Sequence, residues 1–170
     1  MLMDQVNESS KINESTLAIR EARVLGFQTE IISMQGTEFS VVPPLKLLDD
    51  RCIQAGFTMQ GNIKATRIRH RIHNKVPLVV DPFRNMIAMP THSPKHIDNV
   101  WIFSEHILAT HPHTKTQSIV EFTNNQSLIL NCSIHTLDKQ YNRTCRLSAE
   151  SMYRNKQYYM MNYHFNRDKK

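Results

Sequence analysis

Short apolar stretches separated by turn-forming residues dominate the first 130 residues of the chain. Stretches of this length, bounded by polar turn residues, are typical of strands. The predicted strands cover 17–19, 30–33, 38–42, 78–80, 86–89, 107–110, 118–123 and 127–132. Gln35-Gly36, the segment 81–85 and the segment 124–126 contain the Gly, Asp, Pro and Asn that favour turns. The pattern therefore predicts three hairpins and a mainly antiparallel sheet.

Two segments instead repeat their apolar positions every three or four residues, which predicts helices. The first helix lies near 44–54, with Pro44 as its first residue and Gly56 beyond its end. The second lies near 133–147, with Ser133 as its N-cap. Their apolar stripes consist of Leu45, Leu48 and Cys52 in the first helix, and of Ile134, Leu137, Tyr141 and Thr144/Cys145 in the second.

Strands followed by a terminal helix predict an α+β fold. The 170 residues suit a single domain with a hydrophobic core. We expect a flexible N-terminal tail over 1–14, a folded domain over 15–150, and a basic and aromatic C-terminal tail over 151–170.

Composition excludes several classes of protein. The longest apolar runs have four residues, whereas a membrane helix needs about twenty. The N-terminus lacks the basic start and apolar core of a signal peptide. Three cysteines without CxxC spacing indicate reduced thiols in a cytoplasmic protein. The four glycines form neither a P-loop nor a dinucleotide-binding fingerprint.

Positive charge is concentrated in the middle of the chain. The net charge is +6, yet residues 51–97 hold eight basic groups and a single acidic one, Asp81. A local basic field attracts polyanions, and nucleic acid is the commonest such partner. The alternative is a solvated basic face that serves solubility.

The segment 64–75, KATRIRHRIHNK, is the sharpest basic feature. As a strand it would point Arg67, Arg69, Arg71, His73 and Lys75 to one face, and Thr66, Ile68, His70 and Ile72 toward a core. As a helix it would align Lys64, Arg67 and Arg71 at i, i+3 and i+7. The candidate DNA-binding residues are Lys64, Arg67, Arg69, Arg71, His73 and Lys75.

Arginine suits phosphates and the narrow minor groove of A·T-rich DNA, whereas a solvated edge strand would explain the same charges without DNA. No zinc-finger, basic-zipper or helix-turn-helix pattern is present, so we expect a β-scaffold reader of double-stranded DNA. An RNA-binding protein is the first alternative. It is disfavoured because only Phe57 and Phe83 lie near the basic segment to stack on bases.

A metal-dependent enzyme is the second alternative. His111 with His113, and His92 with His96, have the spacing of ligand pairs, but a metal site needs three or four ligands that converge. Asp81, His92 and His106 could form a catalytic cluster, although a turn at Asp81-Pro82 explains Asp81 without catalysis. We expect no enzyme activity, no metal and no cofactor. Trp101 is expected in the core.

Several short segments together resemble the competence transcription factor family ComK of Gram-positive bacteria. They are LLDDRC at 47–52, Gly56, Gly61, PLVVDP at 77–82, IAMPT at 87–91, Trp101-Ile102 and YNRT at 141–144. The resemblance spans roughly 16–150, in order and with few gaps. Each segment alone is weak, and their collinear order carries the resemblance.

The resemblance implies a cytoplasmic, nucleoid-associated activator of DNA-uptake genes. Such a protein would bind paired A·T-rich boxes through the minor groove, act as a dimer or tetramer, and contact RNA polymerase. It also implies degradation by a Clp protease through an adaptor. Tyr158 to Tyr163, with Tyr159, Met160 and Met161 at their centre, resemble the aromatic–Met stretch that the adaptor grips, without the Pro-Lys that would follow. The alternatives are contact between protomers and packing on the sheet.

Overall fold

The computed structural model describes residues 12–167. It contains nine strands and four helical segments in the order β1 Thr16–Glu21, β2 Thr29–Ser33, β3 Gly36–Ser40, α1 Pro44–Gln54, α2 Met59–His70, β4 Leu78–Asp81, β5 Met86–Pro90, β6 Val100–Phe103, the 3-10 turn η2 Ser104–His106, β7 Ile107–Pro112, β8 Ser118–Phe122, β9 Ser127–Leu130 and α3 Ile134–Arg167. The α+β class expected from the sequence is confirmed. Residues 1–11 of the expected N-terminal tail lie outside this range, and Ile12 is buried in the core.

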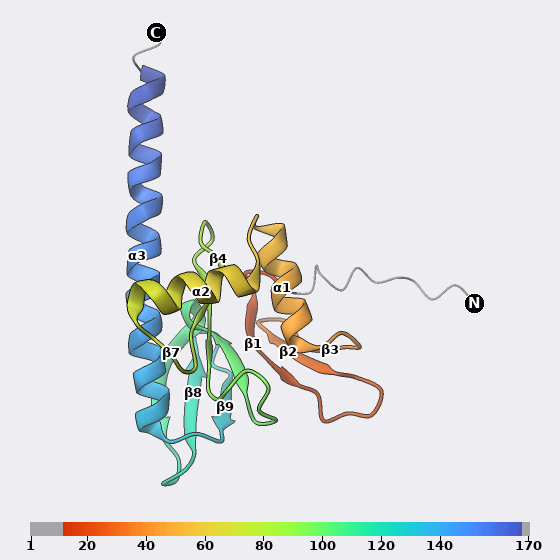
Figure 1. Cartoon of the computed structure of the whole chain (residues 1–170). Helices are drawn as coiled ribbons and strands as arrows, with labels where there is room; N and C mark the ends of the chain where they lie inside the picture. Colours follow the sequence, from red (N-terminus) through yellow and green to blue (C-terminus); the bar gives the residue numbers. More distant parts are fainter. Residues whose placement is uncertain (1–11, 168–170) are drawn as a thin grey trace, which may run out of the picture.

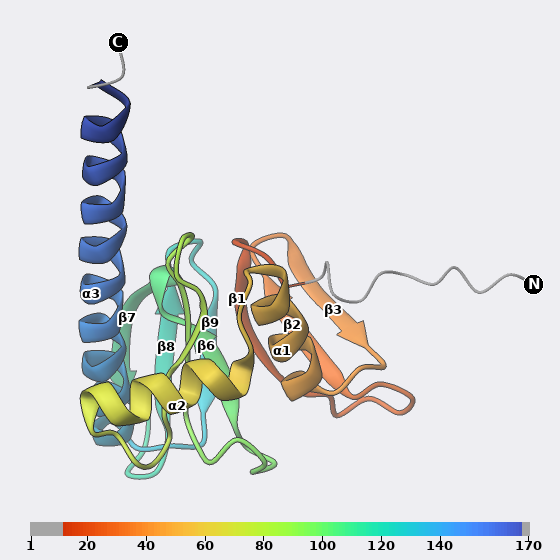
Figure 2. The ribbon, with the colours of Figure 1, turned by 45° about the horizontal axis from the view of Figure 1, so that its top comes forward.

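Two antiparallel sheets form the body. The larger has the strand order β3-β2-β1-β6-β5-β4, and the smaller has the order β7-β8-β9. All neighbouring strands pair antiparallel. In Figures 1 and 2, α3 runs along one edge of the body beside β7 and β8, α1 lies toward the opposite edge near β1 and β2, and α2 crosses the body between them and meets α3.

The larger sheet is buried on both faces. One face packs on α1 through a cluster that includes Ile19, Leu48 and Trp101. The other face packs on β7–β9 and α3 through a cluster that includes Ile102, Phe122 and Leu137. Neighbouring side chains of β6 therefore enter different clusters, which explains its unbroken apolar sequence VWIF. β6 is absent from the predicted strands because a run of this kind has no alternation.

The local predictions around α1 hold. The helix starts at Pro44, whose fixed φ suits the first turn. Gly56, just beyond the helix, has φ of 90°, a left-handed conformation that glycine adopts without steric cost. Of the predicted stripe, Leu48 and Cys52 are buried and Leu45 is half-buried against the core, while Leu47 is buried in addition.

The strand predicted across the basic segment is wrong, because residues up to His70 belong to α2. Thr58 caps this helix by accepting a hydrogen bond from the Gly61 N–H at 3.1 Å. The helical alternative therefore describes the segment. In a helix, residues three or four positions apart lie on the same face, so the residues of this segment that contact the sheet recur at that interval.

The C-terminal helix extends well beyond the predicted end near 147. α3 continues to Arg167 and is 34 residues long. Its first half lies against the body, and its second half projects past it (Figure 1). Within residues 12–167, no helix combines the length and the apolar character needed to cross a membrane.

Candidate nucleic-acid interface

The inner face of α2 fixes the helix on the larger sheet. The Asn62 side chain donates a hydrogen bond to the Val79 carbonyl of β4 at 2.6 Å. Thr66, one turn later, is only 4% exposed. At the start of the helix, the Met59 N–H donates to the Asp49 carboxylate of α1 at 2.9 Å. These contacts set which side chains of α2 face solvent.

The outer face of α2 carries Lys64, Arg67, Ile68 and Arg71, and all four side chains are exposed. Within residues 12–167, neither the lysine nor the two arginines form an ion pair with a carboxylate. Arg71 ends the helix in a left-handed conformation with φ of 53°. Three cations thus lie within two turns with solvent in front of them, so they can neutralise phosphates.

Arg69 lies on the other side of α2, toward α3. Its guanidinium pairs with Glu150 of α3, and the His70 ring contacts the same carboxylate at 2.7 Å. Arg154, one turn along α3, pairs with Glu150 at 3.0 Å. Three basic side chains therefore share one carboxylate where α2 crosses α3 (Figure 1).

Basic side chains outnumber carboxylates at this crossing. Burial and the charges of Arg69, Arg154 and Arg146 lower the pKa of His70. Burial and the charge of Arg154 also lower the pKa of Arg69. In both cases burial is the larger cause of the lower pKa, and the neighbouring cations add to it. An approaching phosphate would relieve this repulsion.

The end of the basic segment packs on the first half of α3. The Gln140 side chain donates to the Lys75 carbonyl at 2.7 Å and to the Pro90 carbonyl at 2.8 Å. Arg143 donates to the Asn74 carbonyl at 3.3 Å. His73 is exposed in this loop, and Lys75 is half-buried. The structure therefore places Lys64, Arg67 and Arg71 on the outer face of α2 and pairs Arg69 with α3, while His73 and Lys75 lie in the loop after the helix.

α3 adds basic residues outside the predicted set. Lys139, Arg143, Arg146, Glu150 and Arg154 follow one another at intervals of three or four residues, which places them along one side of the helix. The same periodicity is visible in the sequence. Their proximity to α2 depends on tertiary packing, since Glu150 lies 80 positions from His70.

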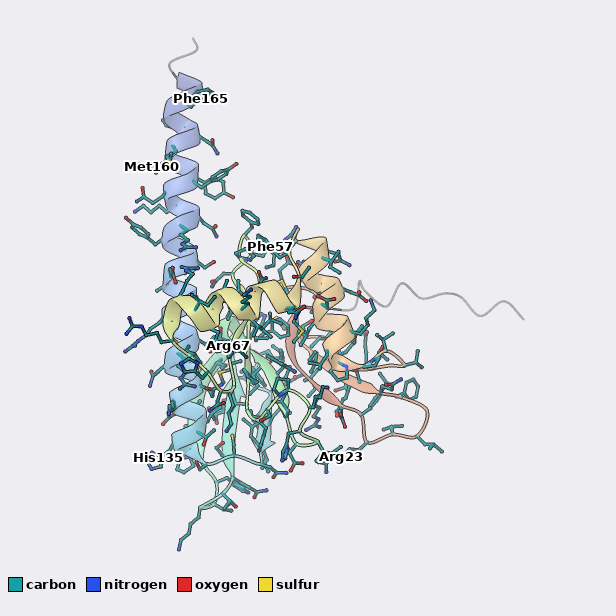
Figure 3. All side chains as sticks on the ribbon, viewed as in Figure 1. Arg23, Phe57, Arg67, His135, Met160 and Phe165 are labelled. Atoms are coloured by element: carbon teal, nitrogen blue, oxygen red, sulfur yellow. The ribbon has the colours of Figure 1, made fainter. Side chains whose placement is uncertain are left out.

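The aromatic–Met stretch lies on the projecting half of α3. The Asn155 amide of α3 donates a hydrogen bond to the Pro82 carbonyl of the body at 2.7 Å. Tyr159, Met160 and Met161 are all exposed beyond it, and Figure 3 shows Met160 well clear of the body. Packing of these three side chains on the sheet is thereby excluded.

The structure shows contacts for three of the histidines considered as metal ligands. The rings of His92 and His96 stack with centroids 4.6 Å apart, and His111 contacts Glu121 at 3.2 Å. No group of three or more His, Cys, Asp or Glu side chains within residues 12–167 has the arrangement of a metal site. Asp81 accepts hydrogen bonds from the Phe83 and Arg84 N–H groups, as its turn position predicts. It also pairs with Arg51 of α1 at 2.9 Å, which the turn does not predict.

Comparison with known proteins agrees with the resemblance. The profile of the ComK protein family matches residues 7–156. The competence transcription factor of Bacillus subtilis (strain 168) is 26% identical over 144 residues, which cover 84% of this chain and 75% of that protein. No solved structure matches the chain. The chain belongs to the ComK family, which is a family of transcription factors rather than of enzymes.

Proposed function

We propose that the protein is a transcription activator of competence genes that binds double-stranded, A·T-rich DNA with the outer face of α2 and the neighbouring cations of α3. The observation that carries this proposal is the set of exposed cations Lys64, Arg67 and Arg71, which form no ion pair with a carboxylate in the described part of the chain, residues 12–167. They adjoin the crossing where Arg69, His70 and Arg154 share Glu150. A continuous cationic surface of this kind binds phosphates with little dependence on base sequence.

Ile68 supports readout through the minor groove. It lies among the cations of the outer face and is 66% exposed, although an isoleucine is usually buried. Minor-groove proteins combine arginines with apolar side chains that wedge between base steps. Arg67 and Arg71 would enter the narrow groove of an A·T-rich box, while Ile68 contacts the bases between them.

A gel-shift series at fixed salt tests this function. An A·T-box duplex should bind more tightly than a G·C duplex and than RNA of the same length. Replacing A·T pairs by I·C pairs keeps the minor-groove surface and changes the major-groove surface. Retained affinity on I·C duplexes supports minor-groove readout, and lost affinity means that the major groove is read. Preference for RNA would contradict the proposal.

Salt dependence tests the contribution of phosphates. If each protomer neutralises about five phosphates, log K should fall with log salt at a slope near −4.5. A fourfold rise in salt then weakens binding by a few hundredfold. A flat response would exclude the cationic surface as the main source of affinity.

For the projecting half of α3, we propose recognition by a protease adaptor through Tyr159, Met160 and Met161, as the family resemblance implies. All three are exposed and lie beyond the family match, which ends at residue 156. Truncation after Lys156 should leave the melting temperature and DNA affinity unchanged and lengthen the lifetime of the protein in cells. If DNA binding instead loses its cooperativity with protein concentration, this segment joins protomers and the adaptor proposal fails.

A further inference from the structure

A cavity of about 340 Å³ lies in the angle where α2 meets α3 (Figure 1). This volume is within the range of small-molecule sites. The two helices form two of its walls, and Val79, Pro82 and Phe83 of the β4–β5 hairpin form the third. Arg69 of α2 lines it, whereas the three exposed cations of the outer face do not. The cavity therefore lies beside the outer face of α2 rather than on it.

Hydrogen bonds hold the three walls together. The Ser151 hydroxyl and the Asn155 amide of α3 both donate to the Pro82 carbonyl, at 3.1 and 2.7 Å. The Asn62 amide of α2 donates to the Val79 carbonyl at 2.6 Å. Each helix is thus bonded to the hairpin, so the cavity is largely pre-formed, as is usual for ligand sites.

Two exposed phenylalanines line the cavity near the start of α2. Phe57 precedes the helix and Phe83 lies in the turn of the hairpin, with ring centroids 6.3 Å apart. They are 37% and 61% exposed, although phenylalanine is usually buried. Exposed aromatic rings offer faces on which nucleic-acid bases stack. This end of the cavity therefore suits a planar aromatic ring.

Asn62 and Asn155 add hydrogen-bond acceptors to the wall. Each uses its amide nitrogen to reach a main-chain carbonyl. A carbonyl only accepts, so this contact fixes the orientation of each amide and leaves its Oδ1 as an acceptor. Neither Oδ1 accepts a hydrogen bond within residues 12–167, and neither is fully buried. A ligand with N–H donors, such as an amino group on an aromatic ring, can pair with them.

Two arginines line the cavity where the helices cross. Arg69 and Arg154 both pair with Glu150, each through Nη2. A guanidinium has five N–H donors, and the two side chains remain 39% and 59% exposed, so donors are left for another acceptor. Two cations beside one carboxylate also leave a net positive charge. This end of the cavity therefore suits an anionic group such as a phosphate.

We propose that this cavity binds a mononucleotide whose base carries an amino group, such as adenosine monophosphate (AMP). The base stacks on Phe57 and Phe83. Its amino group donates to the Oδ1 of an asparagine, and the phosphate binds the two arginines. The aromatic end distinguishes this ligand from a simple anion, which would use the arginines alone. The proposal does not rest on DNA binding, although the two sites share Arg69 and Arg154.

Titrations of the full chain, followed by ¹H–¹⁵N spectra, test the site with four probes. They are AMP, ribose 5-phosphate without a base, adenosine without a phosphate, and inosine monophosphate, in which a carbonyl replaces the amino group. AMP should shift the side-chain amide resonances of Asn62 and Asn155 and saturate with a dissociation constant of about 0.1–1 mM. Ribose 5-phosphate and adenosine should bind at least about tenfold more weakly, because each lacks one end of the ligand. Inosine monophosphate should bind about fivefold more weakly, because it lacks the donated hydrogen bond.

Removal of one aromatic ring should weaken AMP binding. Phe83→Ala should do so by about tenfold, whereas Phe165→Ala, a matched change at a similarly exposed ring of α3, should have no effect. Changing Lys64, Arg67 and Arg71 together to Ala should leave AMP affinity within about threefold of its original value, while it weakens DNA binding. The variants therefore separate failure of this site from failure of the proposed function.

The proposal is overturned if AMP causes no saturable shift, if any of the other three probes binds as tightly as AMP, or if the two phenylalanine variants behave alike. A single-stranded oligo(dA) that binds far more tightly than AMP, and that depends on Phe83, would assign the cavity to an unpaired base of nucleic acid. That result would equally overturn the proposal of a mononucleotide.

Discussion

The two faces of α2 carry similar basic residues but have different neighbours. On the inner side, Arg69 and His70 contact Glu150 and join the helix to α3. On the outer side, Arg67 and Arg71 face solvent. An arginine held by a carboxylate is partly neutralised, whereas an exposed one keeps its full charge for a ligand. Position around the helix, rather than residue type, therefore separates structural from DNA-binding arginines.

The largest expected effect comes from removing the outer cations. Changing Lys64, Arg67 and Arg71 together to Ala should weaken DNA binding by about a hundredfold or more and reduce the salt slope by about three. The helix content should stay the same, because all three side chains are exposed. Gel shifts across a salt series and circular dichroism measure both results.

The matched control removes three exposed cations elsewhere, at Arg23, Lys95 and Lys115. The net charge falls by the same amount, but DNA affinity should change only slightly. Equal losses in the two triple variants would mean that overall charge, rather than the outer face of α2, determines binding.

A lysine introduced on the inner face of α2 should lower the stability of the fold rather than change DNA affinity directly. Thr66→Lys places a charge at a site that is 4% exposed, which costs about 3 kcal/mol or more. The melting temperature should fall by about 6–12 °C. The same substitution two residues later, Ile68→Lys, lies on the exposed outer face and should leave the melting temperature almost unchanged. Calorimetry of both variants checks the orientation of α2, and equal melting temperatures would contradict it.

A substitution of Glu150 tests whether the two arginines that it holds, Arg69 and Arg154, can contribute to DNA binding when they are released. Glu150→Gln removes the carboxylate shared by Arg69, His70 and Arg154. DNA affinity should rise about threefold to tenfold, because two arginines regain full charge. Stability should fall by no more than about 1 kcal/mol, since these ion pairs are partly exposed. Glu121→Gln, which loses a contact with His111, should leave affinity unchanged. A loss of affinity in Glu150→Gln would show that α2 must be held against α3 to bind DNA.

The smallest expected effect concerns Ile68. Ile68→Ser should reduce the preference for A·T over G·C duplexes by a few fold, with the salt slope unchanged, because no charge is lost. Fluorescence anisotropy with both duplexes measures the ratio. An unchanged ratio would mean that shape and arginines alone provide the preference.

Features that depend on nearby residues were predictable from the sequence. Pro44 and Gly56 mark the ends of α1, and the turn 81–85 forms where Asp81 accepts hydrogen bonds from Phe83 and Arg84. Turn and cap preferences act within a few residues, so they survive in the folded chain. Trp101 is also buried, as its apolar neighbours indicate.

The basic segment shows where local pattern is insufficient. Alternating charges at 67, 69 and 71 fit a strand as well as a helix. The choice depends on Asn62 and Thr66, which pack on β4 only when the segment is helical. The length of α3 was likewise underestimated, because its apolar stripe ends where the body ends while its helical backbone continues.

Local sequence patterns were sufficient to predict the α+β class, the hairpins, the first helix and the concentration of positive charge over residues 51–97. Tertiary structure decided which cations remain free. Arg69 is paired because Glu150, far along the chain, reaches it when α3 packs beside α2. Arg67 is exposed and forms no ion pair with a carboxylate within residues 12–167. A charge is available to a ligand only if no partner lies within a few ångströms, and sequence position does not define that distance.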